Sequence, residues 1–289
     1  MKNYRIEETG QYFPTEIVGD NSGSVLDIAY QDVVQNFENA GALVFSGFKC
    51  DIEEFYRFNT QFAAKILRDP FEDRIPHKVS DEIQSVTIGT GGLELHAEFG
   101  HTPFRPDVIS FFCETPASEG GATTICDSAA ILMELERSVL DVFLSKKIRY
   151  EFGISERVWQ KFFLTNDMSA VQKYLKTMGV DAHADRYRTL CAAWETPAVF
   201  KSRFSGLNSI ASNLFERTYP GLRITFADGE EISPEVLSEF GRAAKLHTVE
   251  LKLNSGQMVM LDNTRFLHGR REFLDPLRKL FAIQYMARS

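Results

Sequence analysis

Two short stretches of the chain carry residues whose types and spacing are suited to holding a metal ion. In the first, His96 and Glu98 stand two positions apart, so in a strand both side chains point to the same face and reach one ion. With six histidines and forty acidic residues, such a pair is expected about once by chance. The run His183-Ala184-Asp185 has the same spacing. The spacing alone is therefore weak evidence for a metal site, and the residues around the pair must decide.

The second stretch runs from Asp262 to Arg270 and contains His268, and Arg278 follows ten residues after that histidine. Two imidazoles and one carboxylate on one face of an iron(II) ion leave three positions open for a cosubstrate and oxygen. An arginine deeper in the fold offers a planar fork for the far end of a dicarboxylate. The two stretches together favour an open iron site.

Short strands and a few helices must position these residues. Periodicity and capping signals predict helices over 28–40, from 51 onwards, over 127–144 and from 233 onwards. Strands are predicted over 42–45, 93–99, 107–113, 123–126, 247–253, 257–261 and 278–286. This pattern predicts a mainly β fold, with a barrel or jelly-roll core flanked by helices.

The bulk composition points to one folded unit with an acidic surface. We find no internal repeat and no linker, so residues 1–289 are predicted to form a single domain with an irregular, lid-like insert around 150–205. That insert is expected to cover the barrel mouth, with most of its aromatic side chains packed inside it and one or two in contact with substrate: Trp159, Phe162, Phe163 and Tyr187. The formal net charge of −8 disfavours nucleic acid and anionic membranes as partners. The state of association is not readable from the sequence, and a homo-oligomer stays open.

The chain is expected to be cytoplasmic. Its first residues lack the apolar segment of a signal peptide, and no apolar run approaches the roughly 20 residues of a membrane span. The four cysteines (Cys50, Cys113, Cys126 and Cys191) have no CxxC spacing. They are therefore expected to be four reduced, buried thiols.

Five segments in order along the chain carry a more specific pattern: residues 40–48 (AGALVFSGF), 95–98 with 111–123, 227–232 (ADGEEI), 262–270 (DNTRFLHGR) and Arg278. Together they resemble the TauD/TfdA and clavaminate synthase-like family of iron(II)/2-oxoglutarate-dependent dioxygenases over nearly the whole chain. The resemblance implies a double-stranded β-helix, or jelly-roll, core. It also implies iron(II), 2-oxoglutarate and oxygen as the metal, cosubstrate and oxidant.

The resemblance assigns roles to individual residues. His96, Glu98 and His268 would bind the metal and form the catalytic centre, and Arg278 and Thr123 would bind the C5 carboxylate of 2-oxoglutarate. Glu98 stands where many TauD-like members carry aspartate, which shifts the likeness towards the clavaminate synthase-like branch. Related halogenases lose this acid, so the presence of Glu98 favours oxygen transfer or desaturation.

The expected activity is hydrogen abstraction from an unactivated C–H bond of a small polar molecule, leading to hydroxylation, desaturation or cyclisation with release of succinate and CO2. The likeness to the clavaminate synthase-like branch favours an amino acid or an amino-acid-derived substrate, free or tethered to a carrier protein. Arginines to which the resemblance gives no role, such as Arg105 and Arg203, favour the same class. Candidate substrate residues are Arg105, Arg203 and Asn208, whereas Arg270 and Arg271 are expected to be solvated or supporting. The alternatives are a taurine-, aryloxyacid- or betaine-type dioxygenase and, in a different class, a non-catalytic barrel that binds a metal or small ligand.

Overall fold

The computed structural model describes residues 2–10, 12–70, 74–86, 88–215 and 221–288. Its helices are η1 (Val25–Asp27, a 3-10 helix), α1 (Tyr30–Ala40), α2 (Ile52–Thr60), α3 (Ser128–Glu134), α4 (Arg137–Ser145), α5 (Glu156–Phe163), α6 (Met168–Thr177) and α7 (Pro234–Leu246). Its strands are β1 (Tyr4–Glu7), β2 (Thr15–Gly19), β3 (Ala42–Ser46), β4 (Ala63–Leu67), β5 (Gln84–Ser85), β6 (Leu93–His96), β7 (Val108–Thr115), β8 (Thr123–Asp127), β9 (Lys147–Ile154), β10 (Asp181–Ala184), β11 (Leu190–Pro197), β12 (Phe200–Lys201), β13 (Asn208–Ser209), β14 (Leu222–Phe226), β15 (Thr248–Leu251), β16 (Met258–Asp262), β17 (Phe266–Arg270) and β18 (Lys279–Ala287). None of the described helices is long and apolar enough to span a membrane.

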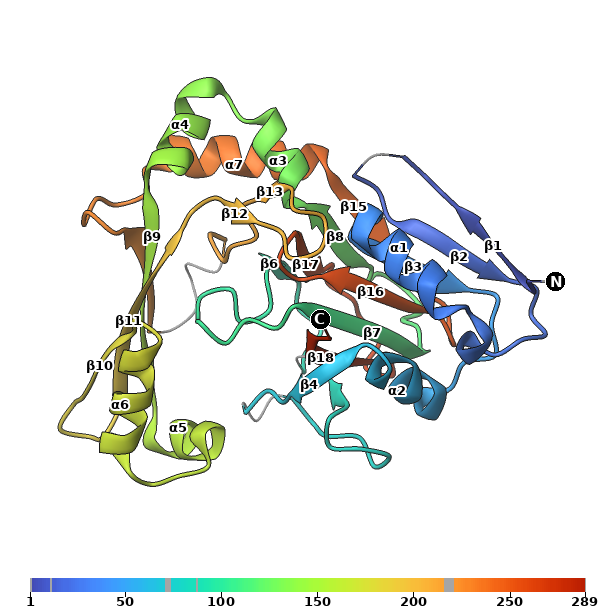
Figure 1. Cartoon of the computed structure of the whole chain (residues 1–289), viewed down its shortest axis with the longest axis horizontal. Coiled ribbons are helices and arrows are strands. Elements are labelled where there is room, and N and C mark those ends of the chain that lie inside the picture. Colours follow the sequence, from blue (N-terminus) through green and yellow to red (C-terminus); the bar gives the residue numbers. More distant parts are fainter. Residues whose placement is uncertain (1, 11, 71–73, 87, 216–220, 289) are drawn as a thin grey trace.

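Two sheets face each other and form the core of the fold (Figure 1). One has the strand order β1-β2-β3-β16-β7-β18-β4, with β5 also paired to β18, and the other has the order β15-β8-β17-β6. Their inner faces share one apolar cluster, to which Val44 and Phe111 contribute from the larger sheet and Ile125 and Phe266 from the smaller one. The predicted mainly β fold with a jelly-roll core is confirmed.

Helices α1 and α2 cover the outer face of the larger sheet (Figure 1). Because successive residues of a strand face opposite ways, β3 sends Phe45 outwards against Phe58 of α2, with 5.1 Å between the ring centroids. The same strand sends Val44 inwards to the core between the sheets. Both faces of β3 are therefore buried, which explains its continuous apolar run.

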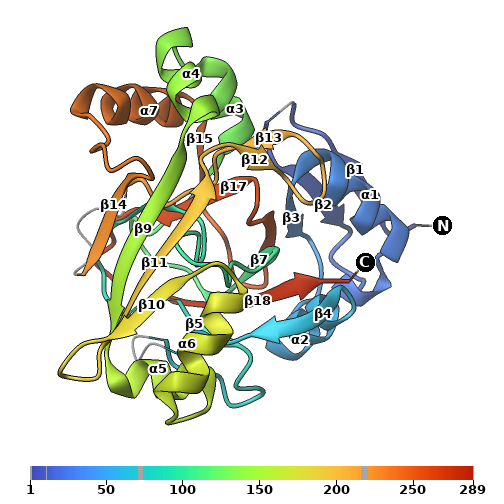
Figure 2. The ribbon, with the colours of Figure 1, turned by 60° about the vertical axis from the view of Figure 1, so that its left-hand side comes forward.

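The segment between β8 and β15 is more ordered than the sequence suggested. It forms a second four-stranded sheet with the order β10-β11-β9-β14, and α5 and α6 pack against its β10 and β11 end (Figure 2). Buried Trp159 and Leu175 join these helices to Leu190 of β11. The expectation of an irregular segment over 150–205 was thus wrong, because short helices interrupt the alternation that reveals strands. The helix predicted over 127–144 is likewise two helices, α3 and α4.

A buried ion pair ties the two halves of the smaller sheet together. Arg265, just before β17, places Nη2 2.5 Å from Oδ2 of Asp127 at the end of β8, and the two side chains are 3% and 0% exposed. Asp127 also accepts a hydrogen bond from the backbone N–H of Ala129, which caps α3. One carboxylate therefore fixes a strand end, a helix start and the approach to β17.

Replacing Arg265 with methionine should lower the free energy of unfolding by about 3–5 kcal/mol, because it leaves the Asp127 carboxylate buried without its cation. Urea denaturation followed by circular dichroism measures the change. The control is Arg271→Met, which removes an exposed arginine paired with Glu250 and should cost at most about 1 kcal/mol. Equal, small losses in both variants would contradict the importance of the buried pair.

Candidate metal centre and substrate cavity

His96, Glu98 and His268 lie together at one edge of the smaller sheet. β6 and β17 are antiparallel neighbours, and His96 is the register partner of His268. One donor atom from each of the three side chains lies within 4.8 Å of the others, and no second group of this kind is found in the part of the chain that the structure describes. The ring centroids of the two histidines are 4.4 Å apart. The residues predicted to be ligands therefore converge, although β6 ends at His96 and Glu98 follows it outside the strand.

The hydrogen bonding of His96 and the burial of His268 suit metal binding. Nδ1 of His96 lies 2.8 Å from the carbonyl oxygen of Glu94, so Nδ1 donates there and Nε2 keeps its lone pair for a metal. Burial lowers the pKa of His268 to about 4, with His96 adding to the effect. His268 is therefore neutral near pH 7, and its buried Nδ1 has no hydrogen-bond partner.

Glu98 is held in its ionised form. Burial acts to raise the pKa of this carboxyl, but the charge of Arg74 and the hydrogen bond with His268 outweigh burial and hold the pKa well below its usual range. Nη2 of Arg74 lies 3.1 Å from each Glu98 oxygen, and its Nε lies 3.4 Å from Oδ2 of Asp69. Two imidazoles and an ionised carboxylate are a donor set that fits iron(II).

Arg74 was not singled out by any pattern in the sequence. Its contact with Glu98 joins residues 24 positions apart, and the described residues that follow it, 75–83, belong to no named helix or strand that would reveal which way it points. Only the fold brings it to the metal-ligand cluster.

Asn263 clamps the Glu98 segment to the start of the second ligand strand. Its side-chain oxygen accepts a 2.8 Å hydrogen bond from the backbone N–H of Glu98, and its Nδ2 donates to the carbonyl oxygens of Glu98 and Pro106, each at 2.9 Å. Asn263 is fully buried. The Asp262-Asn263 part of the recognised motif thus positions Glu98 rather than binding a ligand itself.

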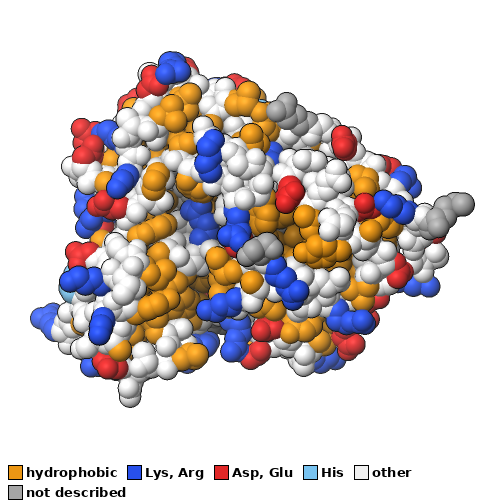
Figure 3. Space-filling view, in the orientation of Figure 1, with side chains coloured by type: hydrophobic (Ala, Val, Ile, Leu, Met, Phe, Trp, Pro, Cys, Tyr) orange, Lys and Arg blue, Asp and Glu red, His pale blue; other side chains and the backbone are white. Residues whose placement is uncertain are grey.

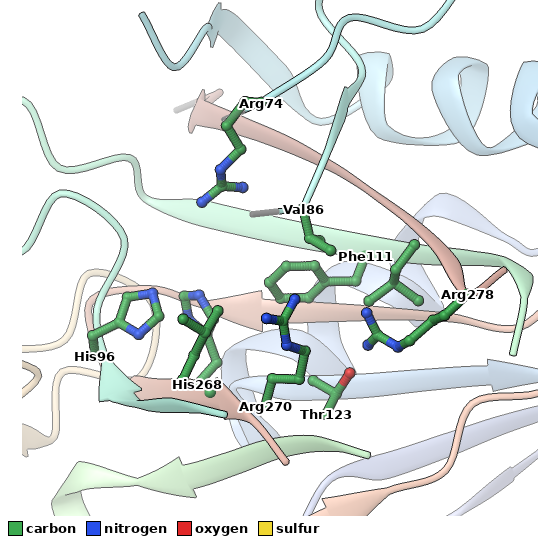
Figure 4. A pocket seen from close by; sticks show the side chains of 11 residues that line it. Arg74, Val86, His96, Phe111, Thr123, His268, Arg270 and Arg278 are labelled. Carbon is green, nitrogen blue, oxygen red and sulfur yellow. The ribbon is translucent and has the colours of Figure 1, made fainter. Parts of the chain in front are cut away.

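Thr123 and Arg278 line the same pocket as His96 and His268 (Figure 4). The guanidinium of Arg278 lies 5.1 Å above the ring of Phe273, and burial lowers its pKa to about 10, so it stays charged near pH 7. No described carboxylate pairs with it. Gly121 leaves space for it, because a Cβ there would lie 3.1 Å from Cδ and Nε of Arg278.

Of the two roles expected for Arg270, solvated or supporting, its burial excludes the first. It is 6% exposed, donates to the carbonyl oxygen of Gly91 at 2.7 Å and lies between His268 and Arg278 (Figure 4). The reason is its place in β17, whose face towards the pocket it shares with His268. Arg271, the next residue, is exposed and paired with Glu250, as expected for a supporting residue.

The three candidate substrate residues lie in different surroundings. Arg105 lines a large cavity next to the metal-ligand cluster. Arg203 is 42% exposed and pairs with Asp107 at 3.3 Å, and Asn208 is exposed on β13; neither lines the cavity that contains Arg105. Their roles stay predictions. The competing histidine, His183, is exposed on β10 and stands outside the metal-ligand cluster.

Replacing Asn263 with alanine should weaken metal binding about 10- to 100-fold, because the backbone of Glu98 loses its partners and a metal ligand loses its orientation. Titration with Mn(II) measures the dissociation constant, and circular dichroism shows whether the fold persists. Asn254→Ala removes an exposed asparagine and serves as the control. An unchanged metal affinity in a folded Asn263→Ala protein would show that the clamp does not position Glu98.

The chain is similar to several known proteins. The chain is 23% identical over 263 residues to the dapdiamide synthesis protein DdaC of Enterobacter agglomerans, covering 81% of this chain and 78% of that protein. A clavaminate synthase-like protein of Arabidopsis thaliana is 22% identical and covers 66% of this chain and 64% of its own length. The fold is similar to that of PvcB of Pseudomonas aeruginosa, an Fe, alpha-ketoglutarate dependent oxygenase from an isonitrile synthetic pathway. The two structures superpose with a TM-score of 0.63 over 99% of this chain and 92% of PvcB, and their sequences are 16% identical. The model of the taurine catabolism dioxygenase TauD, TfdA family matches residues 5–284, and the chain therefore belongs to this family.

Proposed function

We propose that this dioxygenase binds iron(II) through His96, Glu98 and His268 and oxidises an unactivated C–H bond of a small polar substrate. As a member of its family the chain is an oxidoreductase that depends on iron(II) and 2-oxoglutarate. The observation that carries the assignment of ligands is the convergence of the three donor atoms within 4.8 Å. When bound, iron(II) and 2-oxoglutarate would supply the oxidising chemistry, which consumes O2 and 2-oxoglutarate and releases CO2. One oxygen atom of O2 would end in succinate, and the other in the hydroxylated product or, after desaturation or cyclisation, in water.

Arg278 and Thr123 would bind the far carboxylate of 2-oxoglutarate. Both line the pocket that contains the two histidines, and the Arg278 fork has no carboxylate partner of its own among the described residues. A guanidinium and a carboxylate form paired, charge-assisted hydrogen bonds that fix the carboxylate in one orientation. The chain thus offers the cosubstrate an anchor at the opposite end of the pocket from His96.

The protein's own groups would set the geometry of the reaction. The Glu94 carbonyl oxygen holds the His96 ring by its Nδ1, and Asn263 holds the backbone of Glu98. The insert with α5 and α6 forms one wall of the cavity beside the cluster and would shield a bound substrate from water. These residues would orient the metal ligands and keep water away from the substrate. The metal and the cosubstrate would carry out the oxidation itself.

We favour an amino-acid-derived substrate over a taurine, aryloxyacid or betaine. DdaC, which is similar over most of the chain, is a dapdiamide synthesis protein, and PvcB belongs to an isonitrile synthetic pathway. Arg105 lines the cavity and is the candidate for binding a carboxylate of such a substrate. A substrate carried on a partner protein stays within this proposal, as do hydroxylation, desaturation and cyclisation.

A reducing, cytoplasmic setting is part of the same proposal. All four cysteines are free thiols in the structure, but only Cys113 and Cys126 are buried as expected, and Cys50 and Cys191 are partly exposed. Burial raises the pKa of Cys126 and of Cys50 to about 12. Thiols of such high pKa react slowly with oxidants. This is the behaviour expected of structural cysteines in a cytoplasmic enzyme.

Anaerobic addition of iron(II) and 2-oxoglutarate should produce a metal-to-ligand charge-transfer band in the visible spectrum. The band reports direct contact of the cosubstrate with the metal. If the metal is shown to be bound and the band does not form, the proposed function is wrong.

Replacing Arg278 with glutamine should raise the dissociation constant for 2-oxoglutarate about 10- to 100-fold, since a charge-assisted hydrogen-bonded pair contributes roughly 1.5–3 kcal/mol. Titration of the charge-transfer band gives this constant, and Mn(II) affinity should stay the same. Arg271→Gln removes a neighbouring, exposed arginine and should leave both values unaltered. Unchanged saturation in Arg278→Gln would place the anchor elsewhere.

A further inference from the structure

Arg278, the residue proposed to bind the far carboxylate of 2-oxoglutarate, makes few contacts with the rest of the protein. Its guanidinium carbon lies 5.1 Å from the centroid of the Phe273 ring. Its side chain forms no ion pair and no hydrogen bond with any residue that the structure describes. A long arginine side chain has several rotatable bonds, and ordering it costs conformational entropy. The direction in which Arg278 points must therefore be set by packing.

The Arg278 side chain borders two cavities. The first is the pocket that contains the two histidines of the metal-ligand cluster. The second has a volume of about 370 Å³ and is lined mainly by residues 116–122 and 251–254. In Figure 4 the guanidinium points into the first pocket, on the side of Arg270. Only this orientation directs the anchor towards the metal-ligand cluster, so a rotation towards the second cavity would take it away from the cosubstrate.

The ring that contacts Arg278 is held in place by the loops around it. Phe273 is 8% exposed and is the only buried residue in the stretch 271–277. Its backbone N–H donates to the carbonyl oxygen of Thr90 at 3.0 Å, and the N–H of Gly121 donates to the carbonyl oxygen of Glu272 at 3.0 Å. The ring therefore keeps its position without any bound ligand.

Gly121 limits the room for the stem of the arginine. A Cβ at this position would lie 3.1 Å from both Cδ and Nε of Arg278. The φ angle of Gly121 is +65°, a conformation that glycine adopts without the cost paid by other residues. The stem thus runs close to the backbone of Gly121, while the charged end of the side chain contacts the Phe273 ring.

The same ring contacts a second arginine. The guanidinium carbon of Arg270 also lies 5.1 Å from the centroid of the Phe273 ring. Burial lowers the pKa of Arg278 to about 10, with the charge of Arg270 adding to the effect, so the two cations repel each other. The electron-rich face of an aromatic ring attracts a cation within about 6 Å of its centroid. Without this attraction, the repulsion from Arg270 would favour the second cavity as the place of the Arg278 guanidinium.

The large cavity that contains Arg105 lies apart from this ring. Its volume is about 860 Å³, and Figure 3 shows a hollow at its place between the barrel and the insert. Four of its lining residues form an aromatic wall: Phe104, Phe162, Phe163 and Tyr174. Neither Phe273 nor Arg278 is among the described residues that line it. A change at Phe273 is therefore expected to act on the cosubstrate and not on a substrate bound in the large cavity.

We propose that Phe273 is a positioning residue of the cosubstrate site, whose ring keeps the Arg278 guanidinium in the pocket of the metal-ligand cluster and out of the second cavity. Phe273 itself does not touch the cosubstrate. It acts through Arg278, which binds the far carboxylate of a 2-oxo acid. This inference rests on the proposed function and adds to it a residue that determines how tightly, and with what selectivity, the cosubstrate is bound.

The test compares two 2-oxo acids that differ only at the end bound by Arg278. 2-Oxopentanoate has the five-carbon chain of 2-oxoglutarate but ends in a methyl group instead of a carboxylate. Anaerobic titration of the iron(II)-loaded protein, followed by the charge-transfer band, gives both dissociation constants. In Phe273→Leu the constant for 2-oxoglutarate should rise about 2- to 30-fold, as expected for the loss of a cation–π contact. The constant for 2-oxopentanoate should stay the same.

A purely structural role of Phe273 predicts a different result. General loosening of the pocket would weaken both acids equally, and this outcome would overturn the proposal, as would unchanged binding of 2-oxoglutarate. Phe273→Tyr keeps the ring and should bind 2-oxoglutarate within about twofold of the unmodified protein. Phe143→Leu, which shortens a buried side chain of α4 that lines neither cavity, should change neither constant. If Phe273→Leu does not fold, Phe273→Met takes its place, with circular dichroism as the check.

A double variant shows whether the ring acts through Arg278. In an Arg278→Gln background, Phe273→Leu should cause no further loss of 2-oxoglutarate affinity, because residues that act through one another are not additive. The same loss in both backgrounds would mean that the ring acts through Arg270 or through the loop as a whole, and the proposal would be wrong.

The failure of this inference is distinguishable from failure of the proposed function. A charge-transfer band in the unmodified protein, together with equal effects of Phe273→Leu on the two acids, would overturn the role of Phe273 alone. The absence of that band from the metal-loaded protein would overturn the metal and cosubstrate assignment.

Discussion

The site depends on one constraint, the hold of the Asn263 side chain on the backbone of Glu98. Regular strand pairing ends at His96, so the sheet alone does not fix the residue two positions later. Asn263 supplies what the sheet lacks, because its amide accepts from the Glu98 N–H and donates to the Glu98 carbonyl oxygen. Its neighbours Asp262 and Arg265 are anchored in turn by Ser202 and Asp127. The turn between β16 and β17 therefore determines the position of Glu98, which comes from a distant part of the chain.

The second organising feature is the concentration of positive charge in and around the pocket. Arg74, Arg270 and Arg278 line one pocket in a chain whose net charge is −8. Burying guanidinium groups costs free energy unless anions or hydrogen-bond acceptors compensate for the lost water. The Glu98 carboxylate balances the charge of Arg74, and the Gly91 carbonyl oxygen accepts a hydrogen bond from Arg270. Arg278 lies over the ring of Phe273 but pairs with no described carboxylate. The pocket is thus arranged to gain stability when an anionic ligand enters.

Much of the fold and the metal-ligand cluster could be predicted from the sequence. Runs of β-branched and aromatic residues revealed strands such as β7 and β16, and the order of motifs singled out His96 over His183. Capping chemistry revealed α2, because Asp51 accepts from the backbone N–H groups of Glu53 and Glu54. These signals are local, which is why a single sequence displays them.

The features that escaped prediction depend on contacts between distant residues. Arg74 reaches Glu98 from a segment without periodicity, and Arg270 is buried because the loop at Gly91 covers it. The break between α3 and α4 at Leu135 lies in a run whose apolar spacing continues across it. In each case the residue type permits two environments, and only tertiary packing selects one.

The insert has a consequence for how this chain divides its tasks. The aromatic wall of the cavity comes largely from α5 and α6, within one continuous stretch between β9 and β10 (Figure 2). The residues of the metal-ligand cluster all lie outside that stretch, on the barrel. Substitutions in the two helices can therefore reshape the bound molecule's surroundings without moving the strands that hold the ligands. The protein keeps its reactivity and its selectivity on separate parts of the chain, an arrangement that leaves selectivity free to diverge by mutation.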